Sequence, residues 1–207
     1  MIGNKFKFIF IHIPKCGGSS IYKTLAPDIS DDINETEHGG WDSQSKIMKQ
    51  HATAEQIKQL YYPGFHDYFS FTFVRNPWDK SLSDYLWMVN IDDTNRDGSF
   101  TDYLTGKNKF SSKLLKQHRR YDHVIHQLDY ILDSTESNMV DFIGRFENLQ
   151  QDFDIICDKI GIYRQELPHK NKTNHKHYTE YYDDETREIV AEKYAKDIEY
   201  FGYKFGE

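Results

Sequence analysis

The chain has 207 residues, 38% of them hydrophobic, and a formal net charge of −7. This length suits one domain with its own core, so we expect a single domain over residues 1–207, and the acidic balance argues against non-specific binding to nucleic acid or to an anionic membrane. No apolar run approaches the roughly 20 residues of a membrane-spanning helix, and two cysteines make no disulfide framework, so we expect a cytoplasmic protein without an integral membrane segment.

The first predicted element is a strand over residues 6–12, an almost unbroken run of aromatic and β-branched residues. Such a run is typical of a strand that is buried on both faces, as in a parallel sheet. Pro14 lacks the N–H that a sheet needs, so the strand is expected to end near Ile13.

A glycine-rich loop follows this strand and leads into a predicted helix. Gly17 and Gly18 permit positive φ angles and a close approach of the backbone to a ligand, and Ser19 is the expected N-cap. The N–H groups and the dipole at the start of a helix favour an anion, and Lys15 adds a full positive charge beside them. The loop therefore predicts a phosphate site. It lacks the Gly-Lys-[Ser/Thr] sequence of the triphosphate-binding loop, because its lysine precedes the glycines.

The middle of the chain predicts a short helix and then a second strand–helix unit. Thr53-Ala-Glu-Gln56 resembles a capping box, so we expect a helix over residues 54–61. Residues 69–74 are expected to form a second buried strand, which ends just before Arg75. The helix that follows, over residues 77–89, has a proline in its favourable first position.

Two further strands are predicted as a hairpin. Residues 126–132 and 139–146 are strand-like, and a polar turn joins them. Residues 149–160 then have a helical period that stops at Gly161.

The chain closes with a basic, helix-poor loop over residues 164–176 and a final helix over residues 183–200. This helix is expected to end before Gly202. The alternation of strands and helices implies an α/β fold, with a mainly parallel sheet flanked by helices and a C-terminal helix.

Two segments resemble motifs of one enzyme family. The sequence His12-Ile-Pro-Lys-Cys-Gly-Gly-Ser-Ser20 resembles the 5′-phosphosulfate loop of sulfotransferases that use 3′-phosphoadenosine 5′-phosphosulfate (PAPS). The most similar branch is that of the carbohydrate sulfotransferases, which includes the heparan-sulfate 2-O-sulfotransferases and bacterial relatives. That family usually has Thr where this chain has Cys16. The second segment, Arg75-Asn-Pro-Trp-Asp-Lys-Ser-Leu-Ser83, resembles the 3′-phosphate motif of the same family. An Arg fork and a hydroxyl can converge on one phosphate.

The resemblance implies a P-loop-NTPase-like fold and PAPS as the co-substrate, which leaves as 3′-phosphoadenosine 5′-phosphate (PAP). It implies a catalytic role for Lys15 and a late basic loop near the nucleotide, for which a solvated loop is the alternative. The residues expected to contact the cofactor are Lys15, Cys16, Gly17, Gly18, Ser19, Ser20, Arg75, Ser83, Lys172 and Thr173. Glu147 is interpreted as a structural residue near a helix start.

His51 is the predicted catalytic base. It falls just before the expected N-cap Thr53, where the positive end of the helix dipole disfavours the imidazolium and keeps the ring neutral. In related 2-O-sulfotransferases a catalytic His occupies a similar place, between the two cofactor motifs and ahead of a helix. His12 and His38 are the alternative bases, and His12 is expected to support the loop.

The expected reaction is sulfuryl transfer from PAPS to an acceptor hydroxyl, with a carbohydrate as the expected partner. Because the leaving group is already a phosphate monoester anion, no metal is required. No metal site is predicted either, since His175 and His177 lack cysteine or acidic partners at ligand spacing. Two alternatives stay open: a P-loop kinase or nucleotide hydrolase that uses ATP, and a non-catalytic module that binds an anion or a glycan.

Overall fold

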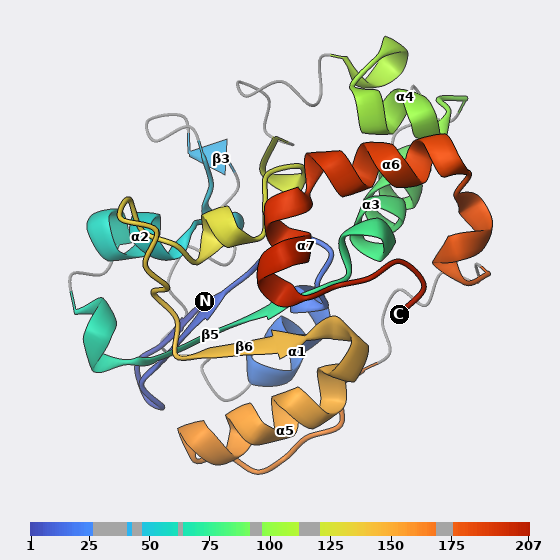
Figure 1. The fold of residues 1–207 in the computed structure, drawn as a ribbon. Coiled ribbons are helices and arrows are strands. Elements are labelled where there is room, and N and C mark those ends of the chain that lie inside the picture. The colour runs from blue at the N-terminus through green and yellow to red at the C-terminus, as the bar shows by residue number, and fades with distance from the viewer. Residues whose placement is uncertain (27–40, 43–46, 62–63, 92–96, 112–120, 169–175) are drawn as a thin grey trace. The chain divides into compact units, whose positions relative to one another are not determined.

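The structure is a computed structural model that describes residues 1–26, 41–42, 47–61, 64–91, 97–111, 121–168 and 176–207 (Figure 1). The chain forms two compact units. Unit 1 comprises Met1–Val74 and Gln127–Lys172, and unit 2 comprises Arg75–His126 and Thr173–Glu207. The assignment of residues 1–207 to one domain stays a prediction.

Unit 1 is built on a four-stranded sheet in the order β1-β2-β5-β6 (Figure 1). The short β1 (Ile2–Gly3) is antiparallel to β2 (Phe8–Ile11), whereas β2 and β6 (Phe142–Arg145) are both parallel to β5 (Phe69–Val74). All four residues of β2 are buried, as the apolar run predicts. The α/β fold with a mainly parallel sheet flanked by helices is therefore confirmed.

Two helix ends of unit 1 lie where the sequence places their caps. Thr53 and Gln56 form the predicted capping box, with Gln56 N–H donating to Thr53 Oγ1 over 3.2 Å. Gly161, with a φ of 76°, ends α5, which packs against β5 and β6. The elements are α1 (Gly18–Leu25), α2 (Ala54–Gln56) with the π-helical turn η3 (Ile57–Tyr61), α5 (Leu149–Ile160), the small sheet of β3 (Trp41–Asp42) and β4 (Ile47–Met48), and the 3-10 turns η2 (Lys49–His51), η4 (Phe65–Asp67), η8 (Leu128–Tyr130) and η9 (Phe146–Asn148).

The predicted hairpin over residues 126–146 is wrong. Residues 128–130 form η8, and the two runs meet only at an isolated bridge between Leu132 and Asn138. The second run pairs with β5 in parallel instead, and Asp141 fixes this pairing because its carboxylate accepts from the N–H and the hydroxyl of Ser70 over 2.7 and 2.9 Å. The second run therefore pairs with β5, which is remote in sequence, and not with the neighbouring run 126–132 as predicted.

Unit 2 is helical and has an aromatic core. Leu82, Tyr103, Phe110 and Val190 are buried in it. Its elements are α3 (Pro77–Ile91), α4 (Phe100–Thr105), α6 (Asp184–Lys193), α7 (Ala195–Phe201) and the 3-10 turns η6 (Asn108–Phe110), η7 (Tyr121–His123) and η10 (Tyr178–Tyr181). The helix predicted over residues 77–89 is confirmed as α3.

The final helix is two helices rather than the predicted one over residues 183–200. Tyr194 leaves the helical conformation, with φ −113° and ψ 27°, and separates α6 from α7. Its ring is buried in the core of unit 2, and its hydroxyl donates to the carbonyl of Val124 over 3.1 Å. The packing of one aromatic side chain therefore outweighs a helical sequence pattern.

A buried polar network, which we call the Asp84 network, joins α3 to η7 and α4. His123 Nδ1 donates to Asp84 Oδ1 over 2.6 Å, and the Tyr103 hydroxyl donates to Asp84 Oδ2 over 2.8 Å. Lys80 Nζ donates to the His123 carbonyl over 2.8 Å, and Trp87 stacks on the His123 ring at 4.9 Å. Burial and the Asp84 charge raise the pKa of Tyr103 well above its ordinary value, so this phenol stays a donor.

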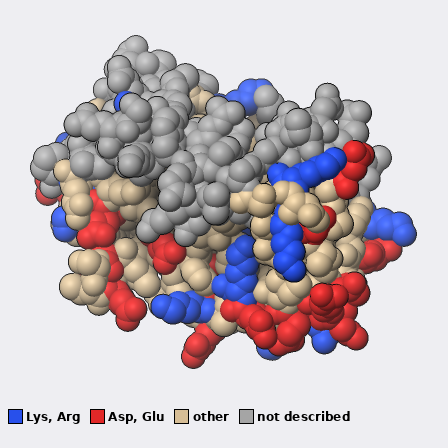
Figure 2. All heavy atoms as spheres, turned by 90° about the horizontal axis from the view of Figure 1, so that it is seen from above, with Lys and Arg blue, Asp and Glu red and all other residues tan. Residues whose placement is uncertain are grey.

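The surface reflects the acidic composition. In Figure 2, Asp and Glu side chains gather along the lower right border of the described surface. Among the described residues, no helix is both long and apolar enough to span a bilayer.

Candidate functional site

The loop after β2 turns the chain into α1 through two left-handed residues. Lys15 has a φ of 68° and Gly17 a φ of 84°. The N–H groups of Ser20 and Ile21 donate to the Gly17 carbonyl over 3.0 and 3.3 Å, so Gly17 is the N-cap of α1. The left-handed conformation of Lys15 costs about 1 kcal/mol or more, and such strain is typical of functional loops.

The prediction that Ser19 is the N-cap is wrong. Ser19 is an exposed residue inside the first turn of α1, and the helix has no side-chain cap. Gly17 replaces it because a residue without a Cβ adopts the positive φ that brings the chain into the helix. The first N–H groups of a helix have no carbonyl partner within it, so those of Gly18 and Ser19 are placed to bind an anion.

Both glycines lie against the ends of neighbouring side chains. A Cβ on Gly17 would lie 2.9 Å from Leu149 Cδ2, at the start of α5. A Cβ on Gly18 would overlap the His12 ring at Cδ2 and Nε2. The sequence predicts that these glycines let a ligand approach the backbone closely. In the structure, the side chains of Leu149 and His12 approach it closely.

We predict that Gly17→Ala destabilises the protein more than Gly202→Ala. Gly202 has a φ of 68°, and among the described residues no neighbouring atom lies within 4 Å of the position that a Cβ would take there. Its replacement therefore adds only the conformational cost of about 1–2 kcal/mol. Gly17→Ala adds contact with Leu149 to a similar cost. Urea unfolding of both variants measures the difference, and equal losses would show that Leu149 yields without cost.

The side chains of Cys16 and Ser20 hold the loop from inside. The buried Cys16 Sγ lies 3.4 Å from Gln127 Oε1 and 3.5 Å from the Pro14 carbonyl. The Ser20 hydroxyl donates to the Pro168 carbonyl over 2.9 Å. Since the Ser20 N–H is also bonded, a phosphate contact from Ser20 requires its hydroxyl to change partner.

Two of the residues that are expected to contact the cofactor belong to the basic loop after Pro168. Lys172 and Thr173 lie outside the described residues, as does His38, one of the alternative bases.

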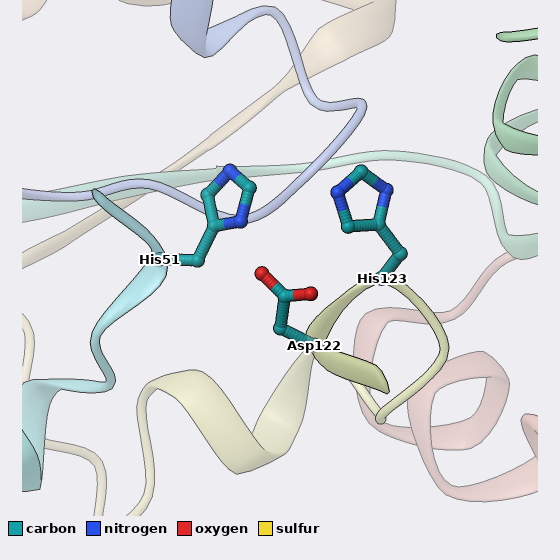
Figure 3. A group of neighbouring side chains, drawn as sticks. All are labelled: His51, Asp122 and His123. Carbon is teal, nitrogen blue, oxygen red and sulfur yellow. The ribbon is translucent and has the colours of Figure 1, made fainter. Parts of the chain in front are cut away.

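His51 lies near the glycine-rich loop, within unit 1. It is buried and belongs to η2 (Figure 3), with its Nε2 3.3 Å from Gln50 Nε2. Its ring meets the His12 ring edge-on, with 4.9 Å between the centroids. Because the His12 ring also covers Gly18, the structure brings His51, His12 and the start of α1 together.

Arg75 and Ser83 belong to unit 2. Arg75 follows the last residue of β5 and is buried, and its Nε donates to Asp79 Oδ2 over 2.7 Å. Ser83 is half-buried on α3, eight residues further on. Asp79 orients the guanidinium fork and was not predicted, although an acid four residues after an Arg at a helix start is a readable signal.

The interpretation of Glu147 as a residue near a helix start is confirmed. It is exposed in η9, directly ahead of α5. Figure 3 also draws Asp122 and His123, which both come from η7 in unit 2 and which the sequence did not single out.

Comparison with known proteins identifies the family. A sequence model of the sulfotransferase family matches residues 1–204, so the chain belongs to the sulfotransferase family, a class of transferases that move sulfuryl groups. The chain is 32% identical over 98 residues to an uncharacterized protein of Archaeoglobus fulgidus, a region that makes up 47% of this chain and 72% of that protein. It is also similar to the crystal structure of a sulfotransferase from Alicyclobacillus acidocaldarius, with a TM-score of 0.48 and 16% identity over 93% of this chain and 92% of that one.

Proposed function

We propose that this sulfotransferase transfers a sulfuryl group from PAPS to a hydroxyl of a carbohydrate. The observation that carries the proposal is the loop of Lys15 to Ser19, in which a lysine in a left-handed conformation stands three residues before Gly18, the first residue of α1, along the chain. An anionic phosphosulfate suits this arrangement. We place the reaction in the cytoplasm, and two buried thiols, Cys16 and Cys157, suit that setting.

The two phosphate ends of the nucleotide are assigned to different segments. At the 5′ end, Lys15 and the N–H groups of Gly17 to Ser19 bind the phosphosulfate, while Cys16 and Ser20 hold the loop. At the 3′ end, the Arg75 fork and the Ser83 hydroxyl bind the phosphate. Lys172 and Thr173 complete the nucleotide site as the family resemblance implies.

The transfer needs a base and a stabilised leaving group. His51 removes the proton of the acceptor hydroxyl, whose oxygen forms a bond to sulfur. The bond between sulfur and the bridging oxygen breaks, and its electron pair stays on the 5′-phosphate of PAP. Lys15 and the loop N–H groups stabilise the charge that develops there.

The alternatives are separated by a thermal-shift comparison. PAP is expected to raise the melting temperature much more than ATP does at the same concentration, because PAP has a phosphate at its 5′ end and another at its 3′ end. Equal shifts would favour the kinase or hydrolase class. Binding of PAP without transfer to any acceptor would favour the non-catalytic module.

We predict that His51→Ala lowers the rate of transfer by about 10²–10⁴-fold, as for loss of a general base. The affinity for PAP is expected to stay within a few-fold, since the base acts on the acceptor. Formation of PAP from PAPS measures the rate, and His177→Ala, an exposed His, is the matched control. Full turnover of His51→Ala would assign the base to another group.

A further inference from the structure

We propose that His12 is a further ligand of the 5′-phosphosulfate end, where its ring N–H donates to the oxygen that leaves with PAP. The inference rests on the proposed function and adds a catalytic residue to it. It differs from the expectation that His12 only supports the loop or replaces His51 as the base.

The position of the ring is fixed on two sides. His12 follows β2 directly, and its ring stacks on Phe10 with 5.6 Å between the centroids and an interplanar angle of 17°. On another side it meets His51 edge-on at 86°. His12 is only partly buried. A ring held in this way is oriented before any ligand binds.

The Nε2 edge of the ring faces the start of α1. The atoms that a Cβ on Gly18 would meet first are His12 Cδ2 and Nε2. Gly18 is the first residue of α1, where the N–H groups and the dipole attract an anion. We therefore assign the Nε2 N–H to the same oxygens that the N–H groups of α1 are proposed to bind.

With this placement the two imidazoles have different roles in the proposed reaction. His51 takes the proton from the acceptor hydroxyl, and the new bond forms between that oxygen and sulfur. As the bond to the bridging oxygen breaks, the electron pair remains on the 5′-phosphate, where the His12 N–H and the Lys15 ammonium donate hydrogen bonds. The glycine at position 18 leaves room for the ring, which explains why a residue without a side chain stands there.

Truncated nucleotides test the assignment by calorimetry. For His12→Ala we expect the affinities for PAP and for adenosine 5′-phosphate to fall about tenfold or more, and the affinity for adenosine 3′-phosphate to stay unchanged. Ser83→Ala is the matched control. It is expected to lower the affinities for PAP and for adenosine 3′-phosphate and to leave the affinity for adenosine 5′-phosphate unchanged. A loss of affinity for all three nucleotides, or for none, would overturn the assignment.

Two more variants separate contact from folding. His12→Asn keeps a donor and is expected to retain part of the 5′-phosphate affinity. Gly18→Ala displaces the ring, which is the end of a rotatable side chain, and is expected to reproduce the nucleotide pattern of His12→Ala in a folded protein. If the wild-type protein binds PAP no better than ATP, the proposed function itself fails; if PAP binds and the His12 pattern is absent, only this inference fails.

Discussion

Lys15→Ala is expected to lower the rate of PAP formation from PAPS by about 10²-fold or more, with a smaller effect on PAP affinity. In the proposed mechanism the Lys15 ammonium stabilises charge that develops on the leaving oxygens, so we expect it to be needed more in the transition state than in the bound state. The rate is measured with the acceptor that gives wild-type turnover, and the affinity by calorimetry.

The left-handed backbone of Lys15 supplies the control. Lys15→Gly removes the charge and also the conformational cost at φ 68°, so its transfer rate is expected to match that of Lys15→Ala while its melting temperature is higher. Lys15→Arg keeps the charge and is expected to retain part of the rate. Full turnover of Lys15→Ala would contradict the mechanism.

Asp84→Ala is expected to lower the free energy of unfolding by about 3–5 kcal/mol. The fully buried carboxylate accepts from His123 and Tyr103, and its removal leaves both donors buried without this acceptor. A loss of this size lowers the melting temperature by on the order of 10 °C in a protein of this length.

An exposed carboxylate is the matched control for Asp84. Asp158 pairs with Arg164 at the surface of unit 1, so Asp158→Ala is expected to change the melting temperature little. Tyr103→Phe removes one of the two donors, and its melting temperature is expected to lie between those of Asp84→Ala and Asp158→Ala. A melting temperature of Asp84→Ala close to wild type would contradict the structural role of the Asp84 network.

The parts of the fold that local chemistry determines were predictable. The run of residues 69–74, the capping box at Thr53 and the glycine at 161 each act through neighbours in sequence, and each is confirmed. The partner of β6 was not predictable in this way, because the pairing depends on Asp141 reaching Ser70, 71 positions away. Tyr194 breaks a helical pattern through its burial, which sequence period does not record.

The candidate site shows the same division. The loop residues could be proposed from the sequence because glycines, a lysine and a helix start follow one another in the chain. The contact of His12 with Gly18 was not found, since it joins a strand end to a helix start through space. The Asp84 network was missed for a related reason: a lone acid on α3 gives no sign of a His that lies 39 positions later.

Transfer of radiolabelled sulfate from PAPS to a panel of glycans tests the central claim most directly. We expect a labelled glycan, formation of an equal amount of PAP, and loss of both in Lys15→Ala. Wild-type protein that labels no glycan and forms no PAP, while ATP stabilises it as strongly as PAP does, would contradict the account.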